Sequence, residues 1–361
     1  MSVLLVQSPE GGKIQHVGGQ AVLEGVMMRS PNSFTVSVRL GDGRIVLRED
    51  RWRSIWHRLR FLRWPLLRGS IVLTEAMWNG ISSLTFSAHW AATEEDKKDE
   101  KKSEAAEKPQ SAEKPQSAEK PLSDLAILGA IVVSFAFSIG LFVALPHALT
   151  ALLGLTTESW QFHAVDGLIK IAILVGYVWG ISFMPDIRRV FQYHGAEHMA
   201  IFTYENDLPL TVENARRFTR FHPRCGTSFL FMVLAISIFV FSVVFPFLPK
   251  LPDWHPVLKN LVYILVKIPL LLPIAGISYE ITRLSARFEK NLLLQIATRP
   301  GVWLQHITTR DPSDDQLEIA LLSLKKCLWR EKAISKTADG PEGRVDFFGS
   351  FAEAAAAIPE S

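Results

Sequence analysis

The chain has 361 residues, 48% of them hydrophobic, and its formal net charge is only +3. This length suits one large domain or two small ones, and so small a charge argues against nucleic acid as a partner. The two cysteines, Cys225 and Cys327, are too few for a disulfide-built scaffold. Reduced thiols in a cytosolic environment are therefore expected.

Residues 1–90 predict a small N-terminal unit that is cytoplasmic or lies at the membrane interface. Residues 33–49 alternate apolar and polar side chains around a Gly-Asp-Gly turn, which is typical of a β-hairpin. The preceding glycine-rich stretch, residues 18–29, is interpreted as a structural loop. Glu24 in this stretch is a candidate polar site residue, although its spacing alone defines no chemistry.

The region from 51 to 90 is predicted to be helical. Its first part, residues 51–68, is rich in arginine and tryptophan, which fits a basic helix on an anionic membrane face. Residues 71–90 are apolar but include Glu75 and Asn79. These polar groups favour an interfacial or re-entrant segment, with a fifth membrane span as the alternative.

Residues 94–123 predict a disordered linker. A charged run leads into EKPQSA repeats with a period of six. Proline and charge leave no apolar face to bury, so the segment is expected to act as a tether.

Membrane spans are indicated by long apolar runs, because a helix needs ~20 apolar residues to cross a bilayer. The mean hydropathy is +0.17, but the apolar residues are concentrated in a few segments. Buried helices of a large soluble protein are the alternative interpretation, and two runs without any charge argue against it. The four predicted spans are Leu125–Leu145, Val165–Met184, Gly226–Leu248 and Leu261–Tyr279.

Lysine and arginine near the spans predict the orientation of the chain. The loop 146–164 has no basic residue and the loop 249–260 has two lysines, whereas the loop 185–225 has six arginines. The regions before the first span and after the last are also rich in arginine. Both termini and the loop 185–225 are therefore predicted to be cytoplasmic.

A histidine-rich motif follows the second predicted span. His194, Glu197 and His198 form H-x-x-E-H, and residues four apart lie on one face of a helix. In the inverted zincin pattern, the two histidines bind zinc and the glutamate is the general base. The motif is short, so the same residues could also form a plain polar cluster that anchors the loop.

The loop ends in a second group of possible ligands, His222 and Cys225, just before the third span. Imidazole and thiolate both suit zinc. Four protein ligands would close the shell and make the metal structural, whereas three would leave a position for water. Glu280 is a further possible ligand, or else a carboxylate in an ion pair. A third interpretation makes Cys225 a nucleophile activated by histidine.

The C-terminal region is predicted to contain a cytoplasmic helix within residues 300–332. Its residues 313–330 are amphipathic, with acidic residues at the start and basic residues at the end. Cys327 on this helix is interpreted as a packing residue. Residues 333–361 are predicted to form a flexible tail.

Three sequence blocks resemble the YqhQ-like family of bacterial membrane proteins of unknown function, some members of which have been described as predicted metal-dependent enzymes. The blocks are GGQAVLEGVMMRSP, the stretch from YHGAEHMAIFTYE to HPRCGTSF, and SYEITRLSAR. The resemblance covers nearly the whole chain except residues 94–123 and the tail. Met199 stands where many relatives are expected to have lysine. The matched polar positions are Glu24, His194, Glu197, His198, His222, Cys225 and Glu280.

Together these patterns predict a mainly α multi-pass protein of a bacterial inner membrane, with about four transmembrane helices and a small N-terminal unit containing a β-hairpin. The expected function is metal-dependent hydrolysis at the cytoplasmic face, with zinc as cofactor and the bilayer as a partner. The substrate or protein partner is not indicated. The alternative is a non-catalytic scaffold or transporter with a structural metal or a plain polar cluster.

Overall fold

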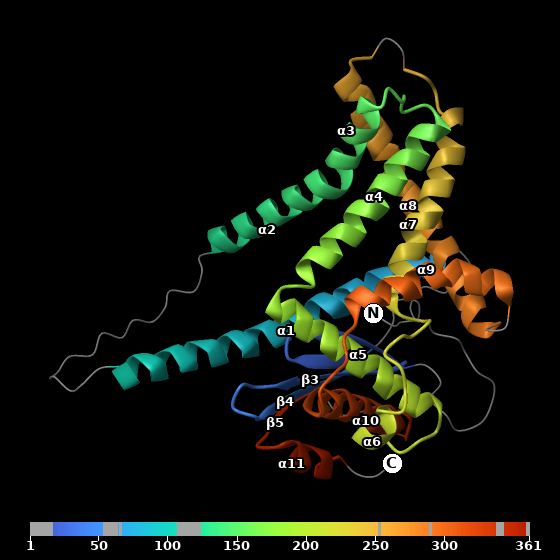
Figure 1. The fold of residues 1–361 in the computed structure, drawn as a ribbon. Coiled ribbons are helices and arrows are strands. Elements are labelled where there is room, and N and C mark those ends of the chain that lie inside the picture. Colours follow the sequence, from blue (N-terminus) through green and yellow to red (C-terminus); the bar gives the residue numbers. More distant parts are fainter. Residues whose placement is uncertain are drawn as a thin grey trace. The chain divides into compact units, whose positions relative to one another are not determined.

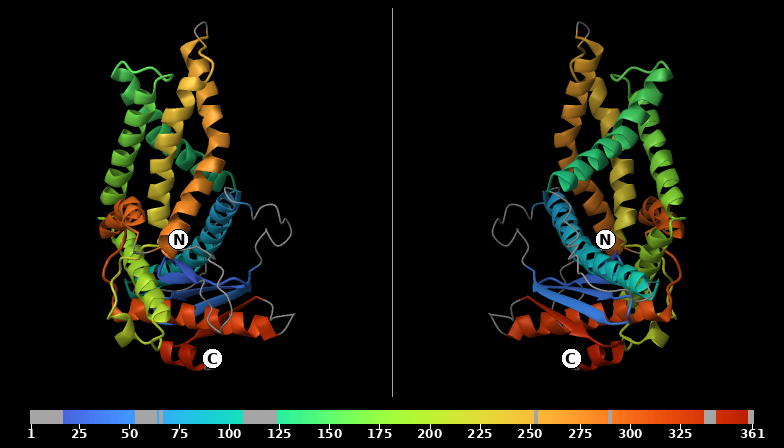
Figure 2. Two further views of the ribbon diagram at one scale, coloured as in Figure 1. Left: turned by 90° about the vertical axis from the view of Figure 1, so that its right-hand side faces the viewer. Right: turned by 90° about the vertical axis from the view of Figure 1, so that its left-hand side faces the viewer.

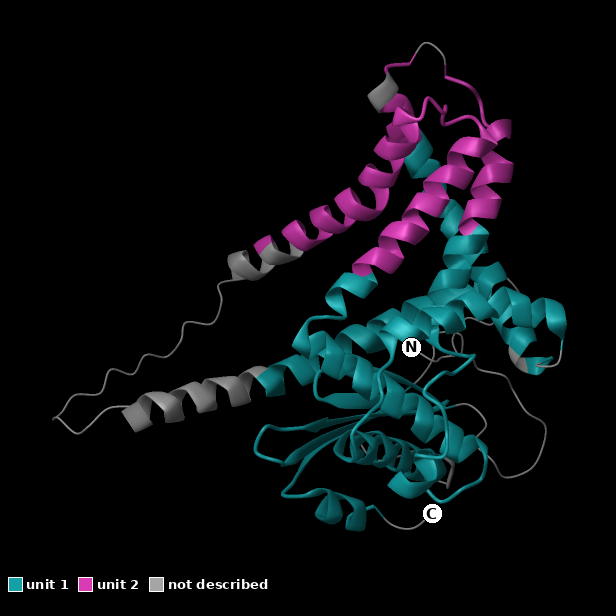
Figure 3. Ribbon diagram, viewed as in Figure 1, with its two compact units in different colours: residues 1–94, 178–236, 263–361 teal, residues 95–177, 237–262 magenta. Residues whose placement is uncertain are grey.

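The computed structural model describes residues 17–52, 64, 67–106, 124–251, 254–288, 291–336 and 343–358. The chain divides into two compact units (Figure 3). Unit 1 combines residues 1–94, 178–236 and 263–361, and unit 2 combines residues 95–177 and 237–262. Each unit is thus assembled from segments that are far apart in the sequence.

Unit 1 is built on a five-stranded antiparallel sheet in which each strand pairs with the next strand in the order β1-β2-β3-β4-β5 (Figure 1). The predicted hairpin is confirmed, because β3 pairs with β4 and Gly43 in their connection has a φ of 92°. Glycine adopts such a left-handed conformation without steric cost. The strands are β1 Gly18–Val22, β2 Gly25–Arg29, β3 Ser33–Arg39, β4 Ile45–Arg51 and β5 Arg344–Phe348.

The glycine-rich stretch at 18–29 is a second hairpin, so its interpretation as a loop was wrong. β1 pairs with β2 through a tight connection in which Glu24 has a φ of 51°. A Cβ on Gly25 would lie 2.2 Å from the carbonyl oxygen of Ser37, so this glycine lets β2 approach β3. Every β2 side chain is buried. The residues of β2, Gly-Val-Met-Met-Arg, do not alternate apolar and polar side chains, which is the pattern by which the hairpin of β3 and β4 was recognised.

The predicted flexible tail is wrong for residues 343–358. β5 pairs with β4, and the short helix α11, Phe351–Ala356, follows it. Ser350 caps this helix by accepting a hydrogen bond from the Glu353 amide at 3.3 Å. Ala354 and Ile358 are buried in the main core. The tail therefore covers an edge of β4 that would otherwise expose unpaired backbone groups.

Helices cover both faces of the sheet (Figures 1 and 2). On one face, α5 (Pro185–Glu205) and α10 (Asp314–Lys336) share a core with β2 and β4. On the other face, Phe34, Val36 and Val38 of β3 pack near Phe86 of α1, which runs Leu67–Ala106. The predicted C-terminal helix at 300–332 is in fact two helices, α9 (Leu292–Thr308) and α10. Thr309–Ser313 separates them, with Pro312 as a helix-breaking residue.

Helix α1 corrects the predicted linker. It continues to Ala106, so residues 94–106 are helical, and residues 107–123 lie outside the described residues. The predicted basic helix at 51–68 also lies largely outside them. Within 71–90, α1 is one amphipathic helix that is not among the candidate membrane spans of the described residues. Its buried residues facing unit 1 include Val72, Glu75, Ala76, Asn79, Ser83 and Ser87.

Four helical segments in the described residues are long and apolar enough to cross a membrane: Val132–Leu152, Trp160–Ile181, Gly226–Phe247 and Leu258–Ser285. These match the four predicted spans. The predicted fold class, a mainly α membrane protein with a small β-containing unit, is therefore confirmed.

The spans are composed of several helical elements. The first contains α2, a π-helical turn and α3, and the last two are built on α7 and α8. Their bounds are α2 Asp124–Ile139, η3 Gly140–Ala144, α3 Leu145–Leu152, α4 Trp160–Ile181, α7 Gly226–Val244, η4 Phe245–Phe247 and α8 Pro256–Arg287. Within unit 2, a Cβ on Gly167 would lie 2.1 Å from Ile238, so this glycine allows α4 to pack closely on α7.

Candidate metal centre

Helix α5 carries the H-x-x-E-H motif and is held between the sheet and the connection from α9 to α10. It starts with Pro185 in its first turn, where proline needs no hydrogen-bond partner. A Cβ on Gly195 would lie 2.2 Å from the carbonyl oxygen of Arg310, whose amide donates to the Phe191 carbonyl at 2.8 Å. Gly195, inside the motif, therefore lets a distant segment cross α5 beside the two histidines.

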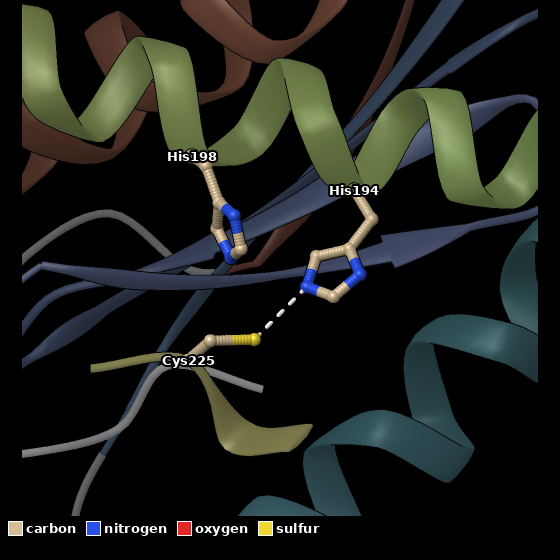
Figure 4. Close-up of side chains that lie close together, drawn as sticks. All are labelled: His194, His198 and Cys225. Carbon is tan, nitrogen blue, oxygen red and sulfur yellow. Dashed lines mark hydrogen bonds between the residues drawn. The ribbon is translucent and has the colours of Figure 1, made fainter. Parts of the chain in front are cut away.

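The structure brings His194, His198 and Cys225 together (Figure 4). One potential ligand atom from each lies within 4.8 Å of the other two, and all three residues are buried. Nε2 of His194 is 3.1 Å from Sγ of Cys225. In a tetrahedral zinc shell with bonds of roughly 2.0–2.3 Å, neighbouring donor atoms lie roughly 3.3–3.6 Å apart. The separation of His194 and Cys225 is close to this value, and separations of up to 4.8 Å would shorten around a bound ion.

Main-chain carbonyls fix the tautomer of both histidines. Nδ1 of His194 donates to the carbonyl of Thr308 at 2.8 Å, and Nδ1 of His198 donates to the carbonyl of Arg220. A carbonyl only accepts, so in each neutral ring the lone pair is on Nε2. Nε2 of His198 has no hydrogen-bond partner among the residues that the structure describes. Metal-binding histidines are usually oriented through their other nitrogen in this way.

The cluster also favours the thiolate of Cys225. Burial alone raises the pKa of this thiol, but His194 and His198 outweigh burial and hold the pKa well below its usual value. The pKa of His198 is likewise set by burial and by the charge of Cys225, which act in opposite directions. Burial lowers its pKa, and the negative charge of Cys225 raises it above the ordinary value. Thiolate is the form of cysteine that binds metals.

His222 lies close to this cluster but is not one of its ligand atoms. Its ring is 5.4 Å from the ring of His198, yet its Nδ1 accepts from the Arg224 amide at 3.2 Å. Its Nε2 faces the carboxylate of Glu205 at 3.6 Å. The Gln305 side chain bonds both the amide and the carbonyl of His222, each at 2.7 Å. His222 therefore fixes the loop that presents Cys225.

Glu197 is buried against β1, and neither carboxylate oxygen has a hydrogen-bond partner in the described part of the chain. A Cβ on Gly19 would lie 2.7 Å from Cγ of Glu197, so only glycine leaves room for this side chain. Its oxygens are not in the three-residue cluster. A buried carboxylate without partners is costly, and a role in chemistry would account for its retention.

The two other candidate carboxylates are engaged elsewhere in unit 1. Glu24 forms an ion pair with Arg189 and is 3.4 Å from the hydroxyl of Tyr193, which ties the hairpin of β1 and β2 to α5. Glu280 on α8 forms a two-pronged ion pair with Arg68 of α1. Neither residue joins the cluster of His194, His198 and Cys225.

Several positioning residues were not recognised from the sequence. Thr308 and Arg220 act through their carbonyl groups, which every residue type possesses, so no sequence signal could identify them. Gln305 is different, because it is a fully buried amide, and the other buried residues of α9 are Thr298, Gly301, Leu304 and Thr308. A long amide side chain among small and apolar residues on the buried side of α9 was a usable signal.

Two comparisons with known proteins place the chain in a family. The model of a family described as "Protein of unknown function (DUF1385)" matches residues 64–330. The chain is also 34% identical over 342 residues to the "Uncharacterized protein YqhQ" of Bacillus subtilis (strain 168), covering 91% of this chain and 96% of that protein. No solved structure matches. The chain therefore belongs to the DUF1385 family, as the resemblance to YqhQ-like proteins implied.

Proposed function

We propose that this protein is a zinc-dependent hydrolase of the bacterial inner membrane, with His194, His198 and Cys225 as the metal ligands. The observation that carries the proposal is the pair of fixed tautomers. Both Nδ1 atoms are committed to carbonyls, so both Nε2 lone pairs are available beside the Cys225 sulfur. Two imidazoles and one thiolate are a donor set that suits zinc.

His194, His198 and Cys225 would hold the zinc, which would supply an activated water as the nucleophile. Glu197 is the proposed general base. It lies next to His198 on α5, and its carboxylate is buried with both oxygens available to accept a proton. The role of Gly19 is then to keep space for the Glu197 side chain.

The proposed site faces the cytoplasm. The arginines of the loop 185–225 and of the regions flanking the spans support this orientation. The bilayer is the protein's permanent partner, and the substrate class is open to experiment.

A non-catalytic scaffold or transporter with a structural metal is the second candidate. It is favoured by the burial of all three ligands and by the proximity of His222, whose ring could supply a fourth nitrogen after a rotation. A closed shell of four protein ligands would then leave no position for water.

The test is metal analysis of the purified full-length protein and three variants. We expect about one zinc per wild-type chain and almost none in His198→Ala, because removing one of three ligands leaves an incomplete shell. His306→Ala, a change to an exposed histidine on α9, is the matched control and should retain zinc. His222→Ala should also retain zinc if the shell is open, whereas loss of zinc would favour the structural centre. Wild-type protein without stoichiometric metal would refute both readings.

A further inference from the structure

Helix α9 has an exposed apolar stripe that water would not favour. Leu292, Leu293, Ile296 and Trp303 are 63%, 76%, 53% and 58% exposed. Their spacing places them on one side of the helix. An exposed stripe of this kind, next to the basic Arg299, is typical of a helix that lies in a membrane surface.

The opposite side of α9 is fixed within unit 1. A Cβ on Gly301 would lie 2.5 Å from Cα of Ser228, so α9 packs tightly on the start of α7. Gln305 bonds the backbone of His222, and Thr308 bonds the ring of His194. These contacts set the rotation of α9 about its axis, and they turn the apolar stripe away from the candidate centre.

The position of α9 in the chain indicates what covers the stripe. The last candidate span ends at Ser285 and its helix α8 at Arg287, and α9 begins at Leu292. Figures 1 and 2 show α9 running across the direction of α8. A helix that follows a membrane span so closely, and lies across it, is held near the bilayer surface.

Charge and a second helix support the same position. Arg283 and Arg287 lie in the final turns of α8, where cations attract anionic headgroups. Helix α1 also meets α8 at this level, through the ion pair of Arg68 with Glu280. It carries its own exposed apolar stripe of Met77, Trp78, Ile81 and Leu84.

We propose that α9 is an interfacial helix whose apolar stripe is embedded in the bilayer surface while its opposite side holds the candidate centre. The occupant of the stripe is the headgroup and upper acyl region of an anionic phospholipid leaflet. The candidate centre then lies about one helix diameter, ~10 Å, from the headgroups. The proposal does not depend on the metal, since it rests on exposure, connectivity and charge.

The test uses nitroxide spin labels on the full-length protein in vesicles of phosphatidylcholine and phosphatidylglycerol. The labelled variants are Ile296→Cys and Trp303→Cys, and Ala352→Cys on α11 is the exposed control. Both native cysteines are buried and should label poorly. Accessibility to oxygen, which concentrates in lipid, is compared with accessibility to a water-soluble nickel chelate.

We expect the two α9 labels to show an oxygen-to-nickel ratio several-fold above that of Ala352→Cys. Ratios equal to the control would place the stripe in water and overturn the proposal. Protection from both reagents would overturn it as well, because a second copy or another protein would then cover the stripe. The zinc content of the same samples is measured separately, so a failure of the hydrolase proposal remains distinguishable.

Discussion

Two regions of unit 1 each bury a glutamate beside a cysteine, Glu331 with Cys327 and Glu197 with Cys225, and the surroundings of the two pairs differ. In the α10 region, Glu331 accepts hydrogen bonds from Ser30 at 2.6 Å and from the amide and side chain of Asn32 at 2.8 and 2.6 Å. In the α5 region, Glu197 has no such partner in the described part of the chain. Both glutamates are therefore buried, but only Glu331 has hydrogen-bond partners among the described residues.

The cysteines repeat the contrast. Burial raises the pKa of Cys327 to about 11, so it is a neutral packing thiol. The pKa of Cys225 is held low by two histidines despite its burial. A region whose buried polar groups satisfy one another stabilises the fold, whereas a region with an unpartnered buried carboxylate and a thiol whose pKa is held low has the character of a functional site.

The largest expected effect is on activity, from Glu197→Gln. The amide keeps the size of the side chain but cannot accept a proton, and a general base contributes typically about 10²–10⁴-fold to rate. Complementation of a deletion strain should therefore fail. Zinc content and melting temperature should stay at the wild-type level, because Glu197 neither binds the metal nor bonds its neighbours. Loss of zinc in this variant would instead make Glu197 a ligand.

A large loss of stability is expected from Glu331→Ala. Ser30 and Asn32 would lose the acceptor for three hydrogen bonds, at a cost of about 3 kcal/mol. The melting temperature in detergent should fall by about 10 °C. Lys332→Arg, which keeps the charge of the exposed neighbour, is the control and should change the free energy of unfolding by less than about 0.5 kcal/mol. If Glu331→Ala melted like Glu197→Gln, the contrast between the two regions would be wrong.

Much of the candidate site could be predicted from the sequence, because the spacing of its side chains places them near one another. The contacts made by the backbone could not be predicted in this way. The spacing of His194 and His198 puts them on one helical face, and Cys225 meets them because its loop returns to α5. His222 was expected as a ligand, but its Nδ1 is used by the backbone of its own loop, a detail of backbone geometry that spacing does not encode. The carbonyls of Thr308 and Arg220 leave no trace in the sequence.

The fold shows the same limit. Alternation identified the hairpin of β3 and β4, whereas β2 reads Gly-Val-Met-Met-Arg and does not alternate, although β2 and β3 are both buried on both faces. β5 is separated from its partner β4 by almost the whole chain. β5 forms because β4 has an unpaired edge, and the residues of the tail alone do not reveal that such an edge exists.

A moderate effect on metal affinity is expected from Gln305→Leu, which tests whether the residues that position the ligands contribute to metal binding. The amide side chain holds the loop of His222 through two hydrogen bonds of 2.7 Å, and that loop presents Cys225. Changes to groups that orient metal ligands typically weaken metal affinity by about 10–100-fold. Competition with a chelator should measure this loss. His306→Ala on the exposed side of α9 should leave the affinity unchanged.

The smallest expected effect is the alkaline sensitivity that Cys327 gives to the fold. Its ordinary pKa is 9.0 and its pKa in the folded protein is about 11, because burial disfavours the thiolate. The contribution of this neutral thiol is therefore fully present below pH 9 and is lost as pH rises from 9 toward 11, where the unfolded chain ionises first. A shift of two pKa units corresponds to about 3 kcal/mol above pH 11, of which about 2 kcal/mol is lost by pH 10.5. Cys327→Ala should show a smaller fall in melting temperature between pH 8 and pH 10.5 than the wild type, even though the cavity lowers its stability at both values. Parallel curves for the two proteins would mean that Cys327 does not set the alkaline limit of the fold.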